Sequence, residues 1–239
     1  MSFDIRPDIV LPVDEIEVTL ESEPHPLETG KAAEIAANWR RESAAKPALF
    51  DGTVVLLSEL CWRDARLIGR CHAVRYATFL YWRSNRQIEG AGHAFAHAML
   101  VAADNALVAI RMSAGTLNAG RVYFAAGSFE PEDFPGGRVD LHRNMAREVL
   151  EETGIDIGGS RRGRRHHVLA TAEGTVIFRR YHLNAGADEI AGRIMRFVGT
   201  QAAPEIDAAV VIRGSGDLPA GLMPHMRPLI DWHFSGGDA

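Results

Sequence analysis

Three glutamates lie within five positions of the segment REVLEETGI, which spans residues 147–155. On an α-helix, residues three and four apart share a face, so Glu148, Glu151 and Glu152 are expected to project together. Like charges on one helix face repel by about 0.2–0.5 kcal/mol per pair, and acidic charge in the last turn also opposes the helix dipole. A divalent cation reverses that balance, because oxygen atoms on one rigid face are the ligands that magnesium prefers. The segment therefore predicts a metal site, and the alternative that these residues leave open is a solvated acidic helix face.

The helix that would carry these glutamates is delimited by the sequence at both ends. Asp140 is a suitable N-cap, and Gly154 stands where a left-handed C-cap residue belongs, which predicts a helix over 141–153. Apolar residues of this stretch are expected to cover one side of the helix while the glutamates face outward. These apolar residues are Leu141, Met145, Val149, Leu150 and Ile155.

Apolar periodicity and turn residues predict strands on both sides of this helix. Before it we expect a helix over 29–44, a strand over 53–60, a strand or short helix over 71–83, and strands near 95–102 and 106–112. After it we expect strands near 168–171, 175–183 and 207–213, a helix over 188–200, and a helix or loop at the end. This order favours an α+β fold, an α/β/α sandwich with a mixed sheet over residues 91–239, preceded by an N-terminal accessory lobe over residues 1–90.

The segment 147–155 resembles the second half of the Nudix box, G-x5-E-x7-R-E-U-x-E-E-x-G-U, in which U is apolar. The residues on specified positions are Arg147, Glu148, Val149, Glu151, Glu152, Gly154 and Ile155. The family places strand, loop, this helix and further strands in the same order as the one predicted above. The resemblance covers about residues 93–235 and implies a Nudix-like mixed sheet for that part of the chain.

The first half of the box departs from the family pattern. Counted from Gly127, five residues lead to Asp133, an acid where the family has glutamate. Thirteen residues then separate Asp133 from Arg147, where the pattern has seven. The simplest explanation is an insertion of six residues in the loop that contains FPGGRVD (134–140). The resemblance therefore leaves the substrate and the role of Asp133 open.

The resemblance implies hydrolysis of a nucleoside diphosphate linked to another moiety, with Mg²⁺ or Mn²⁺ as cofactor. NDP-sugars and ADP-ribose are among the substrates it leaves open. By position, the metal ligands would be Glu148, Glu151, Glu152 and the backbone carbonyl of Gly127. The catalytic residues would be Glu151, Glu152 and Glu205. The substrate-binding residues would be Arg111, Arg147 and Asp133, with Arg147 also expected to brace the glutamates.

Relatives of this kind often supply the general base from a later loop. Glu205 is the first choice here, with Glu189 second and Glu173 third, and each is alternatively an ordinary surface glutamate. His93 and His97 lack the glutamate that the zinc-protease motif places after its first histidine, so we expect packed or exposed bystanders. The aromatic set Tyr76, Phe79, Tyr81 and Trp82 and the basic segment RRGRRHH (161–167) favour core and solvated surface, with ligand binding as the alternative.

Composition limits the remaining possibilities. The 239 residues carry a formal net charge of −5, which disfavours a whole-surface binder of nucleic-acid polymers. Cys61 and Cys71 are expected to be free thiols in a reducing compartment, although a disulfide is left open. The N-terminal segment lacks the apolar core of a signal peptide, and no window approaches the apolar length of a membrane span. We expect a cytoplasmic protein that acts on a small nucleotide without a membrane partner, and a homodimer is left open.

A different class of function is a non-catalytic Nudix-fold module that binds a ligand or a protein. In such a module the box would serve only as a scaffold. The three glutamates argue against this alternative, because a degenerate site has no reason to keep their mutual repulsion.

Overall fold

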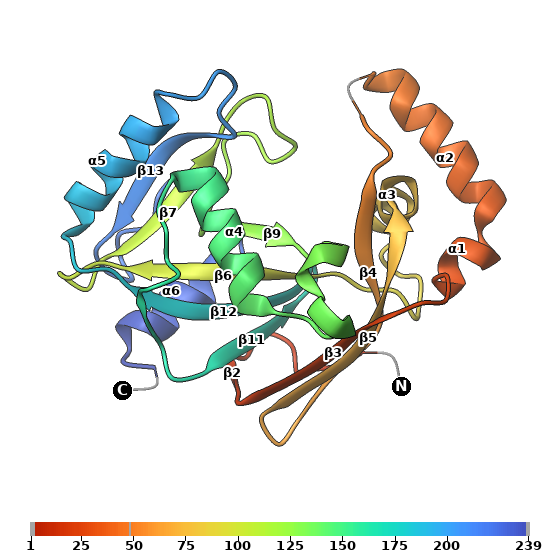
Figure 1. Ribbon diagram of the computed structural model, residues 1–239, viewed down its shortest axis with the longest axis horizontal. Coiled ribbons are helices and arrows are strands. Elements are labelled where there is room, and N and C mark those ends of the chain that lie inside the picture. The colour runs from red at the N-terminus through yellow and green to blue at the C-terminus, as the bar shows by residue number, and fades with distance from the viewer. Residues whose placement is uncertain (1–2, 48, 238–239) are drawn as a thin grey trace.

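The computed structural model describes residues 3–47 and 49–237, which form two β-sheets surrounded by helices (Figure 1). The larger sheet consists, from edge to edge, of β13 (Ile206–Ile212), β7 (Leu107–Met112), β6 (Ala94–Val101), β12 (Gly174–His182), β11 (His166–Thr171) and β2 (Leu11–Val13). Three short strands pair beside them: β8 (Val122–Tyr123), β9 (Ala126–Ser128) and β10 (Arg161–Arg162). β6 and β12 run parallel and the other neighbours run antiparallel. The prediction of an α+β fold with a mixed sheet is confirmed.

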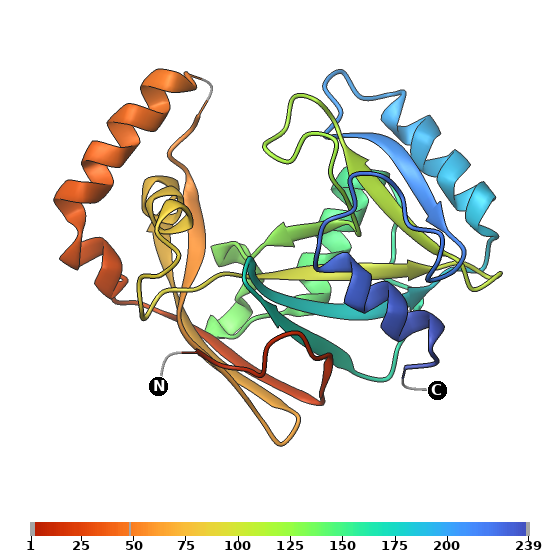
Figure 2. The ribbon, with the colours of Figure 1, turned by 180° about the vertical axis from the view of Figure 1, so that it is seen from behind.

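Helices cover both faces of the larger sheet. Successive residues of a strand point to opposite sides, and β12 shows this directly. Tyr181 faces α4 (Leu141–Thr153), where its hydroxyl lies 3.0 Å from His142 Nδ1. Phe178 faces the other side, where its ring centroid lies 5.1 Å from that of Trp232 in α6 (Met226–Phe234). Figure 2 shows α6 in front of the sheet and α4 behind it, so the sandwich arrangement holds; α5 (Ala187–Val198) lies along β13.

The smaller sheet has the order β1 (Phe3–Asp4), β4 (Thr53–Arg63), β5 (Arg66–Arg75) and β3 (Glu15–Glu21). Its helices are α1 (Pro26–Gly30), α2 (Ala32–Ala45) and α3 (Tyr76–Ser84). β2 comes from the same N-terminal part of the chain but pairs with β11 in the larger sheet. The two sheets share one hydrophobic core, which contains Leu60 and Leu67 as well as Ala96 and Val176. The N-terminal lobe is therefore packed against the larger sheet through apolar side chains.

Residues 71–83, for which the sequence left a strand and a helix open, contain both. β5 ends at Arg75, and α3 begins at Tyr76. Asp51, from a distant turn, accepts a hydrogen bond from the Ala77 backbone N–H at 2.8 Å, and the Tyr76 N–H donates to the Gly52 carbonyl at 2.7 Å. These contacts satisfy backbone donors of the first helical turn. Because the partners are remote in sequence, local periodicity could not locate the start of the helix.

The helix predicted over 141–153 is confirmed with both caps. Asp140 Oδ1 accepts from the Arg143 N–H at 3.0 Å, and Gly154 adopts the left-handed conformation with φ 69°. The orientation of its side chains differs from the expectation. Leu150 is exposed, whereas Glu152 is buried together with Met145. The spacing 141, 145, 148, 152 places the glutamates at 148 and 152 on the same side as the apolar residues, because positions three or four apart align.

The two cysteines are free thiols, as expected. Burial raises the pKa of the Cys71 thiol to about 12, so this group stays protonated near neutral pH. Within residues 3–47 and 49–237, no helix has the length and apolar character needed to cross a membrane.

The C-cap of α4 gives a first test of the fold. A Cβ on Gly154 would lie 2.5 Å from the Phe197 ring, and the residue has a positive φ. We expect Gly154→Ala to lower the free energy of unfolding by about 1–3 kcal/mol in urea titrations. Gly115→Ala is the control, because nothing lies within 4 Å of its Cβ position; it should cause no loss. Equal stability of the two variants would contradict this role of Gly154.

Candidate functional site

Glu148 and Glu152 lie on the side of α4 that faces β9. The Ala126 backbone N–H donates a hydrogen bond to Glu152 Oε2 at 3.2 Å. A Cβ added at Gly127 would stand 1.9 Å from Glu148 Oε1, so only glycine leaves room for this carboxylate. The predicted residues Gly127, Glu148 and Glu152 are thus brought together. The reason for glycine at this position is the close approach of a side chain from another element.

Glu151, the third glutamate, is arranged differently. Its side chain is 60% exposed, whereas that of Glu148 is 13% exposed. Its Oε2 lies 3.4 Å from Arg147 Nη1, and the same guanidinium nitrogen lies 2.8 Å from Glu148 Oε1. The three glutamates therefore share one edge of α4 but not one environment. Arg147 connects two of them, as the bracing role predicted for it requires.

Asp133 holds Arg147 from the other side. Its carboxylate is fully buried, and its Oδ2 accepts from Asn144 Nδ2 at 2.8 Å and from Arg147 Nη2 at 3.2 Å. The Glu130 backbone N–H donates to the same oxygen at 2.9 Å. The carboxylate that the sequence predicted to bind substrate is thus turned into the protein and contacts Arg147, which in turn contacts Glu148 and Glu151.

Burial makes the two inner carboxylates unfavourable as anions. Desolvation, opposed by the Arg147 charge and reinforced by Glu151, raises the pKa of Glu148 to about 7. The pKa of Glu152 lies well above its ordinary value, first because of desolvation and then because of the Glu148 charge. A positive charge placed between these groups would reverse both effects. The pair is therefore a place where a cation gains electrostatic energy.

Glu205, the first choice for a general base, precedes β13 and is exposed. Its charge acts on this site, since it contributes to the raised pKa of Glu152 and to that of Tyr123, where desolvation is the largest cause. Glu189 is instead on α5, exposed and paired with Arg193 at 2.7 Å. Of these two candidate bases, Glu205 is thus the one whose charge acts on a glutamate of α4.

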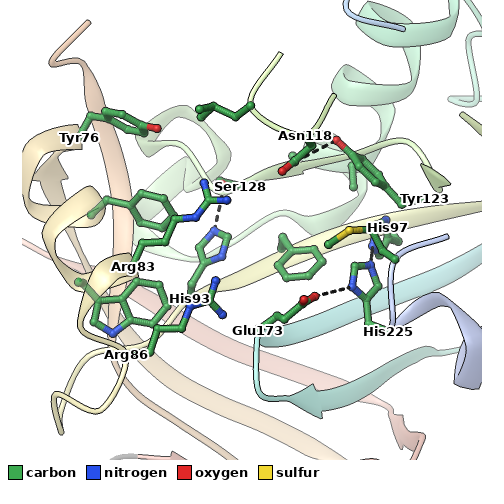
Figure 3. A pocket seen from close by; sticks show the side chains of 17 residues that line it. Tyr76, Arg83, Arg86, His93, His97, Asn118, Tyr123, Ser128, Glu173 and His225 are labelled. Carbon is green, nitrogen blue, oxygen red and sulfur yellow. Dashed lines mark hydrogen bonds and ion pairs between the residues drawn. The ribbon is translucent and has the colours of Figure 1, made fainter. Parts of the chain in front are cut away.

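A pocket of about 320 Å³ lies beside β9, the strand that contacts the glutamates (Figure 3). Ala126, Gly127 and Ser128 of β9 form part of its lining. The opposite wall belongs to α3 of the N-terminal lobe and carries Tyr76, Phe79, Trp82 and Arg83. The pocket thus lies between the two sheets and shares β9 with the glutamates. Phe79 and Trp82 of α3 both belong to a hydrophobic cluster of the N-terminal lobe and line this space.

Histidines that the sequence suggested were bystanders also line the pocket. His93 and His97 flank Phe95 on one side of β6, and His93 Nε2 lies 2.9 Å from Ser128 Oγ. Glu173, the third candidate base, lies there too, and His225 was not foreseen at all. No signal in the sequence marks His225, because it contacts residues far away along the chain.

Two other predicted binding features lie elsewhere. Arg111 is not among the residues that line the pocket, and its Nε is paired with Asp207 Oδ1 at 2.6 Å. The basic segment 161–167 contains β10 and the first residues of β11 instead of a free loop. Its Arg165 is paired with Asp14 at 3.1 Å. The structure therefore does not bring these residues together with the glutamates.

The donor set suits a hard divalent cation. Within the described residues, no three His, Cys, Asp or Glu side chains already stand in a metal-binding arrangement. The buried carboxylate of Glu152 and the half-buried carboxylate of Glu148, beside a strand that has no Cβ at Gly127, nevertheless form a cradle of hard oxygen atoms. Glu151 lies next to them with an exposed carboxylate. These residues fit Mg²⁺ or Mn²⁺ better than a softer metal that prefers nitrogen or sulfur ligands.

Comparisons with known proteins give only distant likenesses. No protein-family model matches the chain, and no curated protein sequence matches it. Similar solved structures include the MutT protein of Methanosarcina mazei Go1, at 17% identity and TM-score 0.42 over 62% of this chain and 96% of that chain. A C. elegans Ap4A hydrolase is similar at 16% identity and TM-score 0.37 over 52% of this chain and 81% of that chain. A NUDIX hydrolase of Nitrosomonas europaea is similar at 14% identity and TM-score 0.36 over 59% of this chain and 70% of that chain. Likenesses at this level assign neither a family nor an activity to the chain.

The raised pKa of Glu148 predicts a pH-dependent cost of folding. Between about 4.5 and about 7 the unfolded chain releases the proton that the folded carboxyl retains, so stability falls as pH rises through this window. In EDTA at pH 8, the free energy of unfolding of Glu148→Gln should therefore be higher than that of the wild type by up to about 3 kcal/mol. The difference should vanish near pH 4.

Chemical denaturation at the two pH values measures this effect. The matched control is Glu132→Gln, which changes an exposed glutamate that is also paired with Arg147. It should leave the free energy of unfolding at pH 8 within about 0.5 kcal/mol of wild type. A Glu148→Gln variant that is less stable than wild type at pH 8 would show that the buried charge is not costly.

Proposed function

We propose that this protein is a metal-dependent hydrolase that cleaves the diphosphate bond of a nucleoside diphosphate linked to another moiety. The observation that carries the proposal is that Glu148, half-buried, and Glu152, buried, both lie against β9, whose residues also line the pocket. Their position costs folding energy, and a cation bound there offsets that cost. The resemblance of residues 147–155 to the second half of the Nudix box supports the same function.

Glu148 and Glu152 would hold the cation, with Glu151 and the backbone at Gly127 as further oxygen donors. When bound, Mg²⁺ or Mn²⁺ supplies positive charge that neutralises the oxygens of the diphosphate. The pocket is large enough for a group attached to that diphosphate, and β9 connects the two places. A small-molecule substrate suits a pocket of this size, whereas a nucleic-acid polymer does not.

The other residues of the site position these groups. Arg147 is paired with Glu132, Asp133, Glu148 and Glu151, so its guanidinium orients carboxylates and is not free to bind a substrate phosphate. Glu205 is the proposed general base, because its carboxylate is exposed and its charge acts on Glu152. It would accept a proton from the attacking water at a carboxylate oxygen.

Chromatographic assays of a panel of nucleoside diphosphate derivatives test the function, because hydrolysis of the diphosphate bond yields a nucleoside monophosphate and the phosphorylated second moiety. We expect turnover with at least one derivative in Mg²⁺ and none in EDTA. Glu152→Gln should lower kcat by about a thousandfold, since the charge it removes corresponds to several kcal/mol of barrier. Glu189→Gln, an exposed glutamate on α5, is the control and should retain wild-type turnover. Absence of turnover with every derivative, together with no Mg²⁺ binding in calorimetry, would instead favour a binding module.

The assignment of Glu205 has its own test. Glu205→Gln should lower kcat by orders of magnitude, about a hundredfold or more, because a positioned base typically contributes that much. Mg²⁺ affinity measured by calorimetry should stay near the wild-type value, since Glu205 is not a proposed ligand. An unchanged rate would remove Glu205 from the mechanism and leave the metal site unaffected.

A further inference from the structure

Three side chains from separate parts of the chain form a hydrogen-bonded series along one wall of the pocket (Figure 3). His97 of β6 has its Nδ1 2.9 Å from the Phe124 carbonyl oxygen and its Nε2 3.0 Å from His225 Nε2. His225 Nδ1 in turn lies 3.4 Å from Glu173 Oε2. Both imidazole rings are buried, whereas the Glu173 side chain is 39% exposed.

The chemistry of the inner end sets the direction of the series. A backbone carbonyl only accepts, so His97 Nδ1 donates to the Phe124 carbonyl oxygen. His97 Nε2 then faces His225 Nε2 at 3.0 Å as an acceptor, and Glu173 Oε2 lies 3.4 Å from His225 Nδ1.

Burial, together with the nearby His225, lowers the pKa of His97 well below its ordinary value, so His97 is neutral and its Nε2 accepts from His225. Desolvation also lowers the pKa of His225, and the hydrogen bond and charge of Glu173 oppose this effect. His225 contacts only Oε2 of Glu173, so the other carboxylate oxygen, Oε1, is a hydrogen-bond acceptor on the pocket side of the series.

The end of the pocket away from Glu173 carries a positive charge. Arg83 has no hydrogen-bonding or ion-pair partner in the described part of the chain, and Figure 3 shows it extending from α3 toward His93 and Ser128. Its charge acts on His93, whose pKa desolvation lowers to about 3 and which is therefore neutral. The Phe95 ring lies between the two ends, 5.5 Å from His93 and 5.3 Å from His225 by ring centroids.

A ligand that fits this order has an anionic end, a flat or apolar face and a hydrogen-bond donor at its far end. The anionic end would lie near Arg83 and β9, which is the strand that contacts the glutamates. The Phe95 ring offers an apolar surface to the middle of the ligand. Glu173 Oε1 would accept from an N–H or O–H group, and it would reject a ligand that presents a carbonyl oxygen there.

We propose that Glu173 is a specificity-determining residue that selects substrates whose ring carries a hydrogen-bond donor, with His225 and His97 as positioning residues. The proposal rests on the proposed function for the location of the diphosphate. The donor is an amino group of a nucleobase or a hydroxyl of a sugar, because both present the same chemistry to a carboxylate oxygen.

Nucleotide binding measured by calorimetry in EDTA tests the proposal without any hydrolysis. The base arm compares GDP with IDP, which lacks the 2-amino donor, and CDP with UDP, in which a carbonyl replaces the 4-amino donor. The sugar arm compares ADP with 2′-deoxy-ADP. We expect the wild type to bind the donor-bearing member at least about tenfold tighter in one arm, since an unpaired buried polar group is costly.

Variants at Glu173 must abolish that preference. Glu173→Ala removes the acceptor, and Glu173→Gln should weaken or invert the preference, because His225 takes its amide oxygen and leaves the amide nitrogen toward the ligand. Glu189→Ala, an exposed change on α5, should keep the wild-type preference. Melting temperatures show whether each variant folds. If one of the two Glu173 variants does not fold, the binding preference of the other tests the proposal.

Three results would overturn the proposal: no binding of any of these nucleotides to the wild type, no donor preference in either arm, or the same preference in the Glu173 variants. A failed hydrolysis assay together with a Glu173-dependent preference would reject only the proposed function. Hydrolysis together with no preference would reject only the role of Glu173.

Discussion

Two carboxylates buried between a helix and a strand are the constraint on which the site depends. Glu152 is tied to the backbone of β9, and Glu148 occupies the space that a side chain at residue 127 would otherwise fill. Without a cation, desolvation raises the pKa of both carboxyl groups, and keeping them ionised opposes folding. Proteins keep costly buried charge where function requires it, and this cost is the physical link between the packing of α4 and its proposed chemistry.

The surroundings of the pair are built to hold it in place. Asp133, although buried, has three donors on one oxygen, and one of these donors is Arg147. The guanidinium then reaches Glu148 and Glu151. This chain of contacts connects the loop between β9 and α4 to the glutamates. Residues outside the site thus fix the orientation of residues within it, as outer contacts commonly do around metal ligands.

The pocket owes its shape to the contact between the two sheets. The larger sheet supplies β6 and β9, and the N-terminal lobe supplies α3. A shared hydrophobic core keeps these walls together, and the paired backbone groups of Leu57 and Gly92 connect the lobes at 2.9 Å. Residues 1–90 therefore form one wall of the pocket, with aromatic and cationic side chains of α3.

The sequence by itself determined the α+β order of elements and the bounds of α4 with its two caps. Those features follow from spacing and from conformational preferences, which are local. The tertiary structure decided which side of α4 is buried, that Asp133 is a support, and that Glu173, His97 and His225 meet. His97 and His225 are 128 residues apart, and no local pattern records that distance. Their contact exists because sheet pairing brings β6 beside β12 while α6 packs on the same sheet.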